Sequence, residues 1–409
     1  MVPNGWDYQP LSKLLEKIID YRGQSVPKAD NGVPLITARN VRDGYLDFTS
    51  KEYVSDQDFE SWMKRGTPRA GDIIFTTEAP LGKACRFPET GRFAVGQRTV
   101  TLRTNSMLDS DYLLYFILSE HGQNLIDLSS SGSTAKGIKS SELKKVKISF
   151  PTNLSEQNKI AKILSTWDKA ITTTEQLLTN SQQQKKALMQ QLLTGKKRLL
   201  DKNGVRFSGE WKTTKLSKMG KIVSGGTPDT NTKEFWDGEI SWLTPTDVTA
   251  LKSRFVLSTA RTISDAGVKN SSATLLPAGS LMVCTRATIG ALAISKTEIC
   301  TNQGFKNIIP YKNFDVNFIY YTLLYNTLEL VRKASGSTFL ELSKKDFENI
   351  ELPCPLLEEE QQKIATVLST ADQEISALQQ KLDALKQEKK ALMQQLLTGK
   401  RRVKVEEVA

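Results

Sequence analysis

The twelve residues KKALMQQLLTGK occur at 185–196 and again at 389–400, which places the copies 204 positions apart in a chain of 409 residues. They belong to a longer repeat, because 156–196 and 360–400 share 25 identical residues in 41 aligned positions without a gap. A repeat of this length and identity does not arise from composition alone. The chain therefore contains an internal duplication.

The duplication reaches both ends of each half. Each half opens with a tryptophan followed five residues later by Leu-Ser-Lys, at Trp6 and at Trp211. SGST occurs at 131–134 and again at 335–338, still 204 positions apart. Between these shared segments the halves have little direct identity. The two copies therefore differ mainly in their globular parts.

The two 41-residue segments are predicted to be long helices. They lack proline and glycine until Gly195 and Gly399, which stand where a helix C-terminal glycine belongs. Apolar residues recur in both at alternating steps of four and three, which is a heptad seam interrupted by Thr174, Ser181 and Lys185 in the first copy and by Lys389 in the second. The seam positions are Ile160, Leu164, Trp167, Ile171, Leu178, Leu188 and Leu192 in the first copy, and Ile364, Leu368, Ala371, Ile375, Leu378, Leu382, Leu385, Leu392 and Leu396 in the second. Their length favours pairing of the two helices over a single amphipathic helix on a domain surface.

Chain geometry predicts the direction of this pairing. About 40 helical residues make a rod of roughly 60 Å, whereas residues 197–210 reach at most about 45–50 Å when fully extended. If each globular part lies at the start of its own helix, the second helix must start near the end of the first. We therefore predict an antiparallel coiled coil with an approximate two-fold axis and one globular part at each end.

Each globular part combines short β-type runs with helical stretches. GDIIFTT and GSLMVCT are examples of the first, and DYLLYFILSEHGQNLI and VNFIYYTLLYNTLELV of the second. With small gaps, AGDIIFTTEAPLGKA at 70–84 aligns with AGSLMVCTRATIGAL at 278–292. The predicted fold class is α+β with mixed or antiparallel sheets. We predict globular domains at 1–154 and 211–357, helical spacers at 155–196 and 358–399, a linker at 197–210 and a tail at 400–409.

Composition limits the classes of function. Fifty-six Lys and Arg against 45 Asp and Glu give a net charge of +11, which suggests a polyanionic partner or a solvated basic surface. No stretch has the length of a membrane span and no signal pattern opens the chain, so a cytoplasmic protein is expected. The four cysteines form no CxxC pair and are expected to be reduced and mostly buried. The one histidine, His121, is expected at the surface or at a helix end.

Motifs for nucleotide binding and catalysis are missing. The sequence has no GxGxxG after a strand, no GxxxxGK[ST] loop, no HExxH and no GxSxG. It also lacks the Asn/Asp-Pro-Pro-aromatic motif of amino-methyltransferases. We therefore expect no catalytic residues, no metal site and no cofactor bound by this chain.

Two diverged globular parts on a stiff spacer could read two different DNA half-sites. The duplicated EQxKIAxxLSTxDxxI and KKALMQQLLTGK segments, the SGST stretches and the shared openings resemble the specificity subunits of type I DNA restriction–modification systems. The resemblance covers essentially the whole chain. It implies two target recognition domains and a pseudo-two-fold antiparallel coiled coil. It also implies a non-catalytic subunit that reads a bipartite, asymmetric site in double-stranded DNA.

The same resemblance implies protein partners. They are two adenine methyltransferase subunits that use S-adenosylmethionine and, in the full complex, two restriction subunits that use ATP and Mg²⁺. Contact with the methyltransferase is predicted on outward helix faces that include Gln157, Lys159, Gln361 and Lys363. Two alternatives stay open: a coiled-coil scaffold without a nucleic-acid role, and a DNA-modifying enzyme with concealed motifs. Salt-dependent DNA affinity would argue against the first, and methylation without partners would favour the second.

Candidate DNA contacts are basic and polar residues in glycine- and proline-rich loops. Arginine suits guanine, because its fork can bond O6 and N7 together, and Gln97 and Gln303, at similar places in the halves, could read adenine. SGST could contact phosphate or form a turn. The candidates are Lys64, Arg65, Arg69, Thr77, Lys83, Gln97, Arg98 and Lys136 in the first half, and Thr244, Thr246, Arg254, Arg286, Thr288, Gln303, Lys306 and Lys333 in the second.

Overall fold

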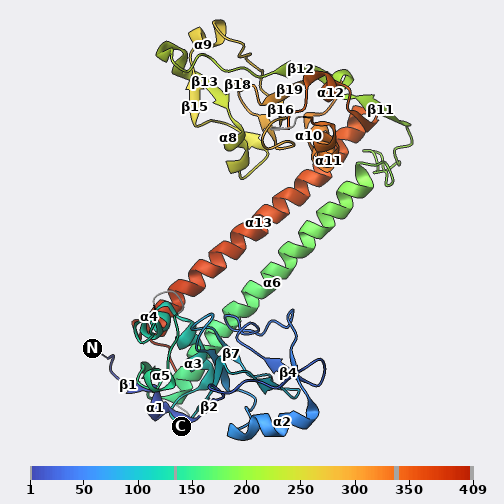
Figure 1. Ribbon diagram of the computed structural model, residues 1–409. Coiled ribbons are helices and arrows are strands. Elements are labelled where there is room, and N and C mark those ends of the chain that lie inside the picture. Colours follow the sequence, from blue (N-terminus) through green and yellow to red (C-terminus); the bar gives the residue numbers. More distant parts are fainter. Residues whose placement is uncertain (1, 133–135, 336–339, 406–409) are drawn as a thin grey trace. The chain divides into compact units, whose positions relative to one another are not determined.

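A computed structural model describes residues 2–132, 136–335 and 340–405 (Figure 1). The chain forms two compact units. Unit 1 comprises Met1–Glu175 and Gln380–Ala409, and unit 2 comprises Gln176–Gln379. Each unit contains a globular part, here called its head, and a portion of both long helices. The predicted domains, which follow the chain in linear order, differ from these units because both helices are shared between them.

The two long helices are α6 (Leu154–Leu192) and α13 (Glu358–Leu396). Both agree with the predicted spacers to within a few residues. After each helix comes the glycine of the repeat, Gly195 with φ of 71° and Gly399 with φ of 70°. A left-handed backbone that satisfies the last helix carbonyls favours glycine there. The glycine of KKALMQQLLTGK therefore ends both helices.

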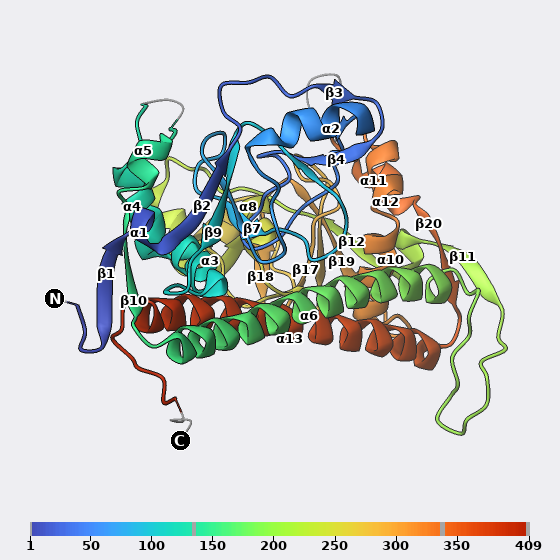
Figure 2. The same cartoon turned by 90° about the horizontal axis from the view of Figure 1, so that it is seen from below.

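Within unit 1, the first part of α6 packs against the last part of α13. Lys389 Nζ lies 2.5 Å from Asp168 Oδ1, and Lys386 Nζ lies 2.7 Å from Glu175 Oε1. Residue numbers rise along α6 while those of the partners fall along α13, so the two segments are antiparallel. Figures 1 and 2 both draw them side by side.

Within unit 2, the last part of α6 packs against the first part of α13 in the same way. Lys185 Nζ lies 2.5 Å from Asp372 Oδ1, and the Ser181 hydroxyl donates to Glu374 Oε1 at 3.0 Å. This pairing is also antiparallel. The predicted direction of packing is thus confirmed inside each unit.

The heptad residues fall into two groups. Those near the helix ends join the cores of the heads: Ile160, Leu164 and Leu396 in unit 1, and Leu192, Ile364 and Leu368 in unit 2. Leu178 and Leu382 are buried as well. The other predicted seam positions are half-buried, and they are Trp167, Ile171, Leu188, Ala371, Ile375, Leu378, Leu385 and Leu392. The seam positions near the helix ends thus pack into the cores of the heads, which the heptad spacing did not predict.

The head of unit 1 has three small sheets. They have the strand orders β1-β10, β2-β9-β6-β7 and β3-β5-β4-β8, and all pairs are antiparallel except β4 with β8. The strands are β1 (Trp6–Pro10), β2 (Leu15–Asp20), β3 (Lys28–Ala29), β4 (Val33–Ile36), β5 (Tyr53–Val54), β6 (Ile73–Thr76), β7 (Ala84–Arg86), β8 (Ala94–Val95), β9 (Thr99–Thr104) and β10 (Lys147–Pro151). The helices are α1 (Leu11–Leu14), α2 (Asp56–Trp62), the 3-10 turn η1 (Met63–Arg65), α3 (Ser110–Leu118), α4 (Glu120–Leu128) and α5 (Ser140–Leu143).

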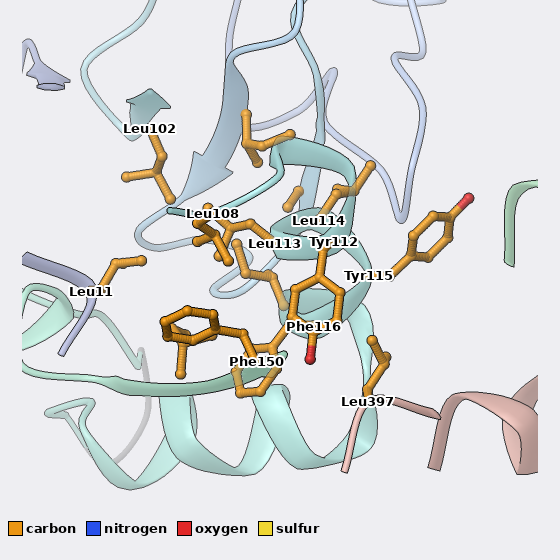
Figure 3. Packing of buried hydrophobic residues seen from close by; sticks show 14 of the residues in the cluster. Leu11, Leu102, Leu108, Tyr112, Leu113, Leu114, Tyr115, Phe116, Phe150 and Leu397 are labelled. Carbon is orange, nitrogen blue, oxygen red and sulfur yellow. The ribbon is translucent and has the colours of Figure 1, made fainter. Parts of the chain in front are cut away.

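The largest core of unit 1 forms around α3. Asp109 caps this helix by accepting a bond from the Tyr112 backbone N–H at 2.8 Å. Tyr112 and Phe116 then pack beside Phe150 of β10, and Leu397 joins them from the end of α13 (Figure 3). The start of α6 and the end of α13 therefore share one hydrophobic core with the head.

The head of unit 2 is built differently. Its sheets have the orders β11-β20, β12-β19-β16-β17-β14 and β15-β13-β18. The strands are β11 (Trp211–Lys215), β12 (Gly220–Ser224), β13 (Trp236–Leu243), β14 (Phe255–Val256), β15 (Arg261–Ile263), β16 (Leu281–Cys284), β17 (Leu292–Ser295), β18 (Ile299–Thr301), β19 (Phe305–Pro310) and β20 (Glu351–Pro355). The helices are α7 (Leu216–Met219), the 3-10 turn η2 (Lys233–Phe235), α8 (Pro245–Ala250), α9 (Asp265–Lys269), α10 (Val316–Tyr325), α11 (Thr327–Lys333) and α12 (Lys344–Glu348). Mixed α+β heads are therefore confirmed in both units.

Smaller predictions about single residues also hold. All four cysteines are free and buried. His121 is exposed in the first turn of α4. Among the described residues, no helix combines the length and apolar character needed to cross a membrane.

Candidate nucleic-acid interface

In unit 1, three loops meet beyond the ends of β6 and β9. Thr77, directly after β6, donates its backbone N–H to the Arg98 carbonyl at 3.0 Å, and its own carbonyl accepts from the Ile138 N–H at 3.0 Å. Next to it, Glu78 and Arg98 form an ion pair with 3.3 Å between Oε1 and Nε. Gln97 Oε1 accepts from the Val26 N–H at 3.3 Å. We call Glu78, Gln97 and Arg98 the tip of unit 1.

Unit 2 repeats this backbone arrangement. Thr285 donates its N–H to the Gly304 carbonyl at 2.8 Å, and its carbonyl accepts from the Leu342 N–H at 2.9 Å. Gln303 Oε1 accepts a bond from the Thr227 hydroxyl. We call Arg286, Gln303 and Gly304 the tip of unit 2.

The bonding pattern makes the two tips structurally equivalent. Arg286 pairs with the backbone of Glu341 as Glu78 pairs with that of Gly137, in an isolated antiparallel bridge. Gln97 and Gln303 therefore occupy matching positions, as the sequence predicted. Each glutamine has its side-chain oxygen held by a neighbouring loop.

Several other predicted DNA contacts lie on the surface. Lys64, Arg69, Thr246 and Thr288 are exposed. Others already have partners inside their own unit: Lys83 with Asp43, Lys136 with Asp127, Lys333 with Glu329, and Arg65 with the carbonyls of Asp20 and Arg22. Thr244 caps α8 through its hydroxyl. SGST at 131–134 and 335–338 lies partly outside the described residues.

Three predicted DNA contacts are wrong because their side chains point into a unit. Thr77 is buried and its hydroxyl donates to the Arg98 carbonyl. Lys306 is buried, and this burial lowers its pKa. Arg254 donates to Asn317, to the Tyr321 hydroxyl and to Ser369 Oγ, the last at 2.6 Å in α13. It connects the head of unit 2 to the helix and leaves little of its guanidinium free.

The predicted outward position of Gln157 and Gln361 is also wrong. Both are fully buried in the first turn of their helices. Gln157 accepts from the Asp109 N–H at 2.7 Å and donates to the carbonyls of Met107 and Pro151. Gln361 makes the same three bonds in unit 2, with Asp315, Asn313 and Pro355. These amides join each helix start to its head, while Lys159 and Lys363 are exposed as predicted.

Two matched ion pairs at the helix starts were not predicted from the sequence. Glu156 in α6 accepts both bonds from Arg402 at 2.7 Å, and Glu360 in α13 accepts both from Arg198 at 2.5 and 2.7 Å. Both acids are buried. The signal was present, because each pair lies at the same 204-residue offset as the repeat. Glu78 was not among the predicted DNA contacts either, although the alignment of 70–84 with 278–292 pairs it with Arg286.

Comparison with known proteins now decides the family. A family model described as "Type I restriction modification DNA specificity domain" matches residues 11–180 and 208–387, which is most of the chain and once per half. This chain belongs to that family. The two matches coincide with the duplication, so each half carries one copy of the type I DNA specificity domain.

Members of the family match over about two fifths of the chain or over nearly all of it. The MjaIX specificity subunit of Methanocaldococcus jannaschii is 39% identical over 168 residues, covering 41% of this chain and 39% of that protein. The putative MjaX specificity subunit of the same organism is 27% identical and covers 98% of this chain and 95% of its own. The EcoR124I/EcoR124II specificity subunit of Escherichia coli is 32% identical over 40% of this chain and 41% of that protein.

Solved structures show the same fold. The S subunit of a type I restriction–modification system from M. genitalium has a TM-score of 0.59 at 15% identity, with 97% of both chains covered. The HsdS subunit from Thermoanaerobacter tengcongensis has a TM-score of 0.52 at 18% identity, with 98% of both chains covered. The type I specificity fold is therefore present along nearly the whole chain.

Proposed function

We propose that this chain is the DNA-specificity subunit of a type I restriction–modification complex. It reads a bipartite, asymmetric site in double-stranded DNA and positions methyltransferase and restriction subunits there. One observation carries the proposal: the same contacts to the long helices support two heads whose sheets and tips differ. Two different heads on a repeated pair of helices are suited to a DNA site whose two halves differ in sequence.

The repeated support can be followed residue by residue. In unit 1, Lys389 binds Asp168, which also accepts a bond from the Tyr115 hydroxyl at 2.7 Å. In unit 2, Lys185 binds Asp372, which accepts from the Tyr321 hydroxyl at 2.6 Å. Each carboxylate therefore joins the other helix to its head. This arrangement fixes each head on the helices while leaving its tip open to change.

DNA binding itself would depend on phosphate contacts and on the tips. The excess of basic residues supplies the charge for counterion release, which is insensitive to sequence. The exposed side chains of Lys64 and Arg69 in unit 1 are available for it, and the exposed hydroxyls of Thr246 and Thr288 in unit 2 are available to hydrogen-bond phosphate oxygens. Base reading then requires side chains that enter a groove with fixed geometry.

Catalysis is assigned to the partners. S-adenosylmethionine would be bound by the methyltransferase subunits, and ATP and Mg²⁺ by the restriction subunits. The partner contact would use outward faces of α6 and α13, on which Lys159 and Lys363 are exposed. Two methyltransferase subunits, one for each half of the duplicated support, match the repeat, with two restriction subunits in the full complex.

The test is co-expression with a methyltransferase subunit of the same system, followed by genome-wide mapping of N6-methyladenine. We expect a split, non-palindromic motif with one methylated adenine in each half. Exchanging residues 1–150 for another family member's head should change one half of the motif and leave the other intact. A continuous or palindromic motif would refute the proposal. So would methylation by the purified chain alone, or DNA affinity that is independent of salt.

A further inference from the structure

The two tips share a backbone but carry opposite charges. Glu78 in unit 1 and Arg286 in unit 2 occupy matching positions. Each directly follows an equivalent threonine, Thr77 or Thr285, and each forms an antiparallel bridge with an equivalent later segment, at Gly137 or Glu341. The opposing position holds Arg98 in unit 1 and Gly304 in unit 2. The charge difference is therefore built on a constant backbone.

In unit 1 the tip presents an acceptor and a donor side by side. The Glu78 and Arg98 side chains are 51% and 58% exposed and lie 3.3 Å apart. An exposed pair of this kind contributes little to stability in water. Its carboxylate can accept from the exocyclic amine of cytosine or adenine, and its guanidinium can donate to a purine N7.

In unit 2 the tip presents a donor alone. Arg286 is exposed, and none of the described residues forms an ion pair with it. The nearby Glu341 lies 3.8 Å from Lys306 Nζ. A Cβ added at Gly304 would stand 3.8 Å from Arg286 Cβ, so the residue opposite Arg286 contributes no side chain of its own, whereas unit 1 has Arg98 at that position. A free guanidinium of this kind suits the O6 and N7 atoms of guanine.

Both tips are also held on an uncommon backbone. Ala79, directly after Glu78, has φ of 45°, and Ala287, directly after Arg286, has φ of 62°. Alanine in this left-handed region is strained, and such positions persist only where the surrounding structure enforces them. The same uncommon conformation directly after Glu78 and directly after Arg286 is a further point of equivalence between the two tips.

We propose that the tips contain the specificity-determining residues that make the two half-sites different. These residues are Glu78 and Arg98 in unit 1 and, at the position that matches Glu78, Arg286 in unit 2. Arg286 reads a guanine in the half-site of unit 2. The Glu78–Arg98 pair reads a base pair that offers an amine beside a purine N7 in the half-site of unit 1. This inference rests on the proposed function and names the residues that carry it out.

The experiment compares the co-expressed complex carrying Arg286→Ala, Glu78→Gln or no substitution. Methylation maps are combined with binding to duplexes in which each base pair of the wild-type motif is changed in turn. Arg286→Ala should lose preference at one guanine of one half only, with the discrimination there falling about ten- to hundredfold. Glu78→Gln should relax one position in the other half only.

Arg206→Ala is the matched control, because Arg206 is an exposed arginine of unit 2 outside the tip and its loss changes the net charge by the same amount. It should weaken binding to all sequences alike and keep the motif. A wild-type complex without a split motif would overturn the proposed function. A wild-type split motif that Arg286→Ala and Glu78→Gln leave unchanged would overturn only the assignment of the tips. Relaxation of both halves by Arg286→Ala would also overturn it.

Discussion

The ion pair between Arg198 and Glu360 allows a sharp test of how the helices hold the heads. The Glu360 side chain is 1% exposed and that of Arg198 is 18% exposed. Arg198→Ala would leave a buried carboxylate without its two charge-assisted bonds. Losing one partner of a buried pair typically costs about 3–5 kcal/mol, and we expect about 3 because Arg198 retains some solvent access.

The duplication supplies an internal comparison. Arg402 makes the same two bonds to Glu156, whose side chain is 4% exposed, but Arg402 itself is 45% exposed. Water can therefore replace much of the lost guanidinium. We expect Arg402→Ala to cost about 1–2 kcal/mol, clearly less than its counterpart in unit 2.

Hydrogen exchange with peptide resolution measures both effects in one molecule. A loss of about 3 kcal/mol is about a 150-fold faster exchange, expected for Arg198→Ala in peptides from the start of α13 and not in those from the start of α6. Arg402→Ala should give the reverse pattern with a smaller factor. Equal factors for the two variants, or faster exchange in the wrong unit, would refute the argument from burial.

Three further outcomes follow from other parts of the structure. Urea titration should show that Gln361→Ala lowers the free energy of unfolding by about 2–3 kcal/mol, because three backbone groups lose a buried partner. By the same measurement, Gln362→Ala at an exposed position should lower it by less than about 0.5 kcal/mol. Gly399→Ala should cost about 2–3 kcal/mol, because its Cβ would meet Pro3 Cγ at 2.6 Å, while Gly279→Ala, with nothing within 4 Å, should cost only the left-handed strain of about 1 kcal/mol; similar losses would contradict this. Burial raises the pKa of the Cys85 thiol to about 12, so native thiols stay protonated at pH 8 and should react with a disulfide reagent only on unfolding. Because the unfolded thiol ionises near its ordinary pKa of 9, stability should fall as pH rises from about 9 towards 12, and flat stability over that interval would contradict it.

The helical half of the fold could be predicted from sequence because its signals are local. Heptad spacing and the glycines at 195 and 399 predict the length and ends of α6 and α13 within a few residues. The pairing direction followed from the short reach of residues 197–210, given that each globular part lies at the start of its own helix. The orders of the sheets could not be predicted, because strands such as β1 and β10 are joined across nearly the whole first half.

The candidate site was predictable only in part, for a physical reason. Polar residues at the start of a helix are usually solvated, which is why Gln157 and Gln361 were expected outside. They are buried because loops about 50 residues earlier supply an N–H and one of the two carbonyls that satisfy their amides. Arg254 was expected at DNA because it is a basic residue in a predicted loop, and it instead meets Ser369 of α13. No local pattern reports such distant partners.

The contacts between the helices also explain why one chain contains KKALMQQLLTGK twice. Unit 1 takes Asp168 from the first copy of the helical repeat and Lys389 from the second, and unit 2 takes Lys185 from the first and Asp372 from the second. Each copy therefore supplies its first half to the head that precedes it and its second half to the other unit. A change in either half of one copy alters a contact with the other copy. Among the described residues, the side chains at the tips make no such contact with the other copy. Glu78 and Arg286 can therefore differ in charge although the backbone around them is arranged in the same way.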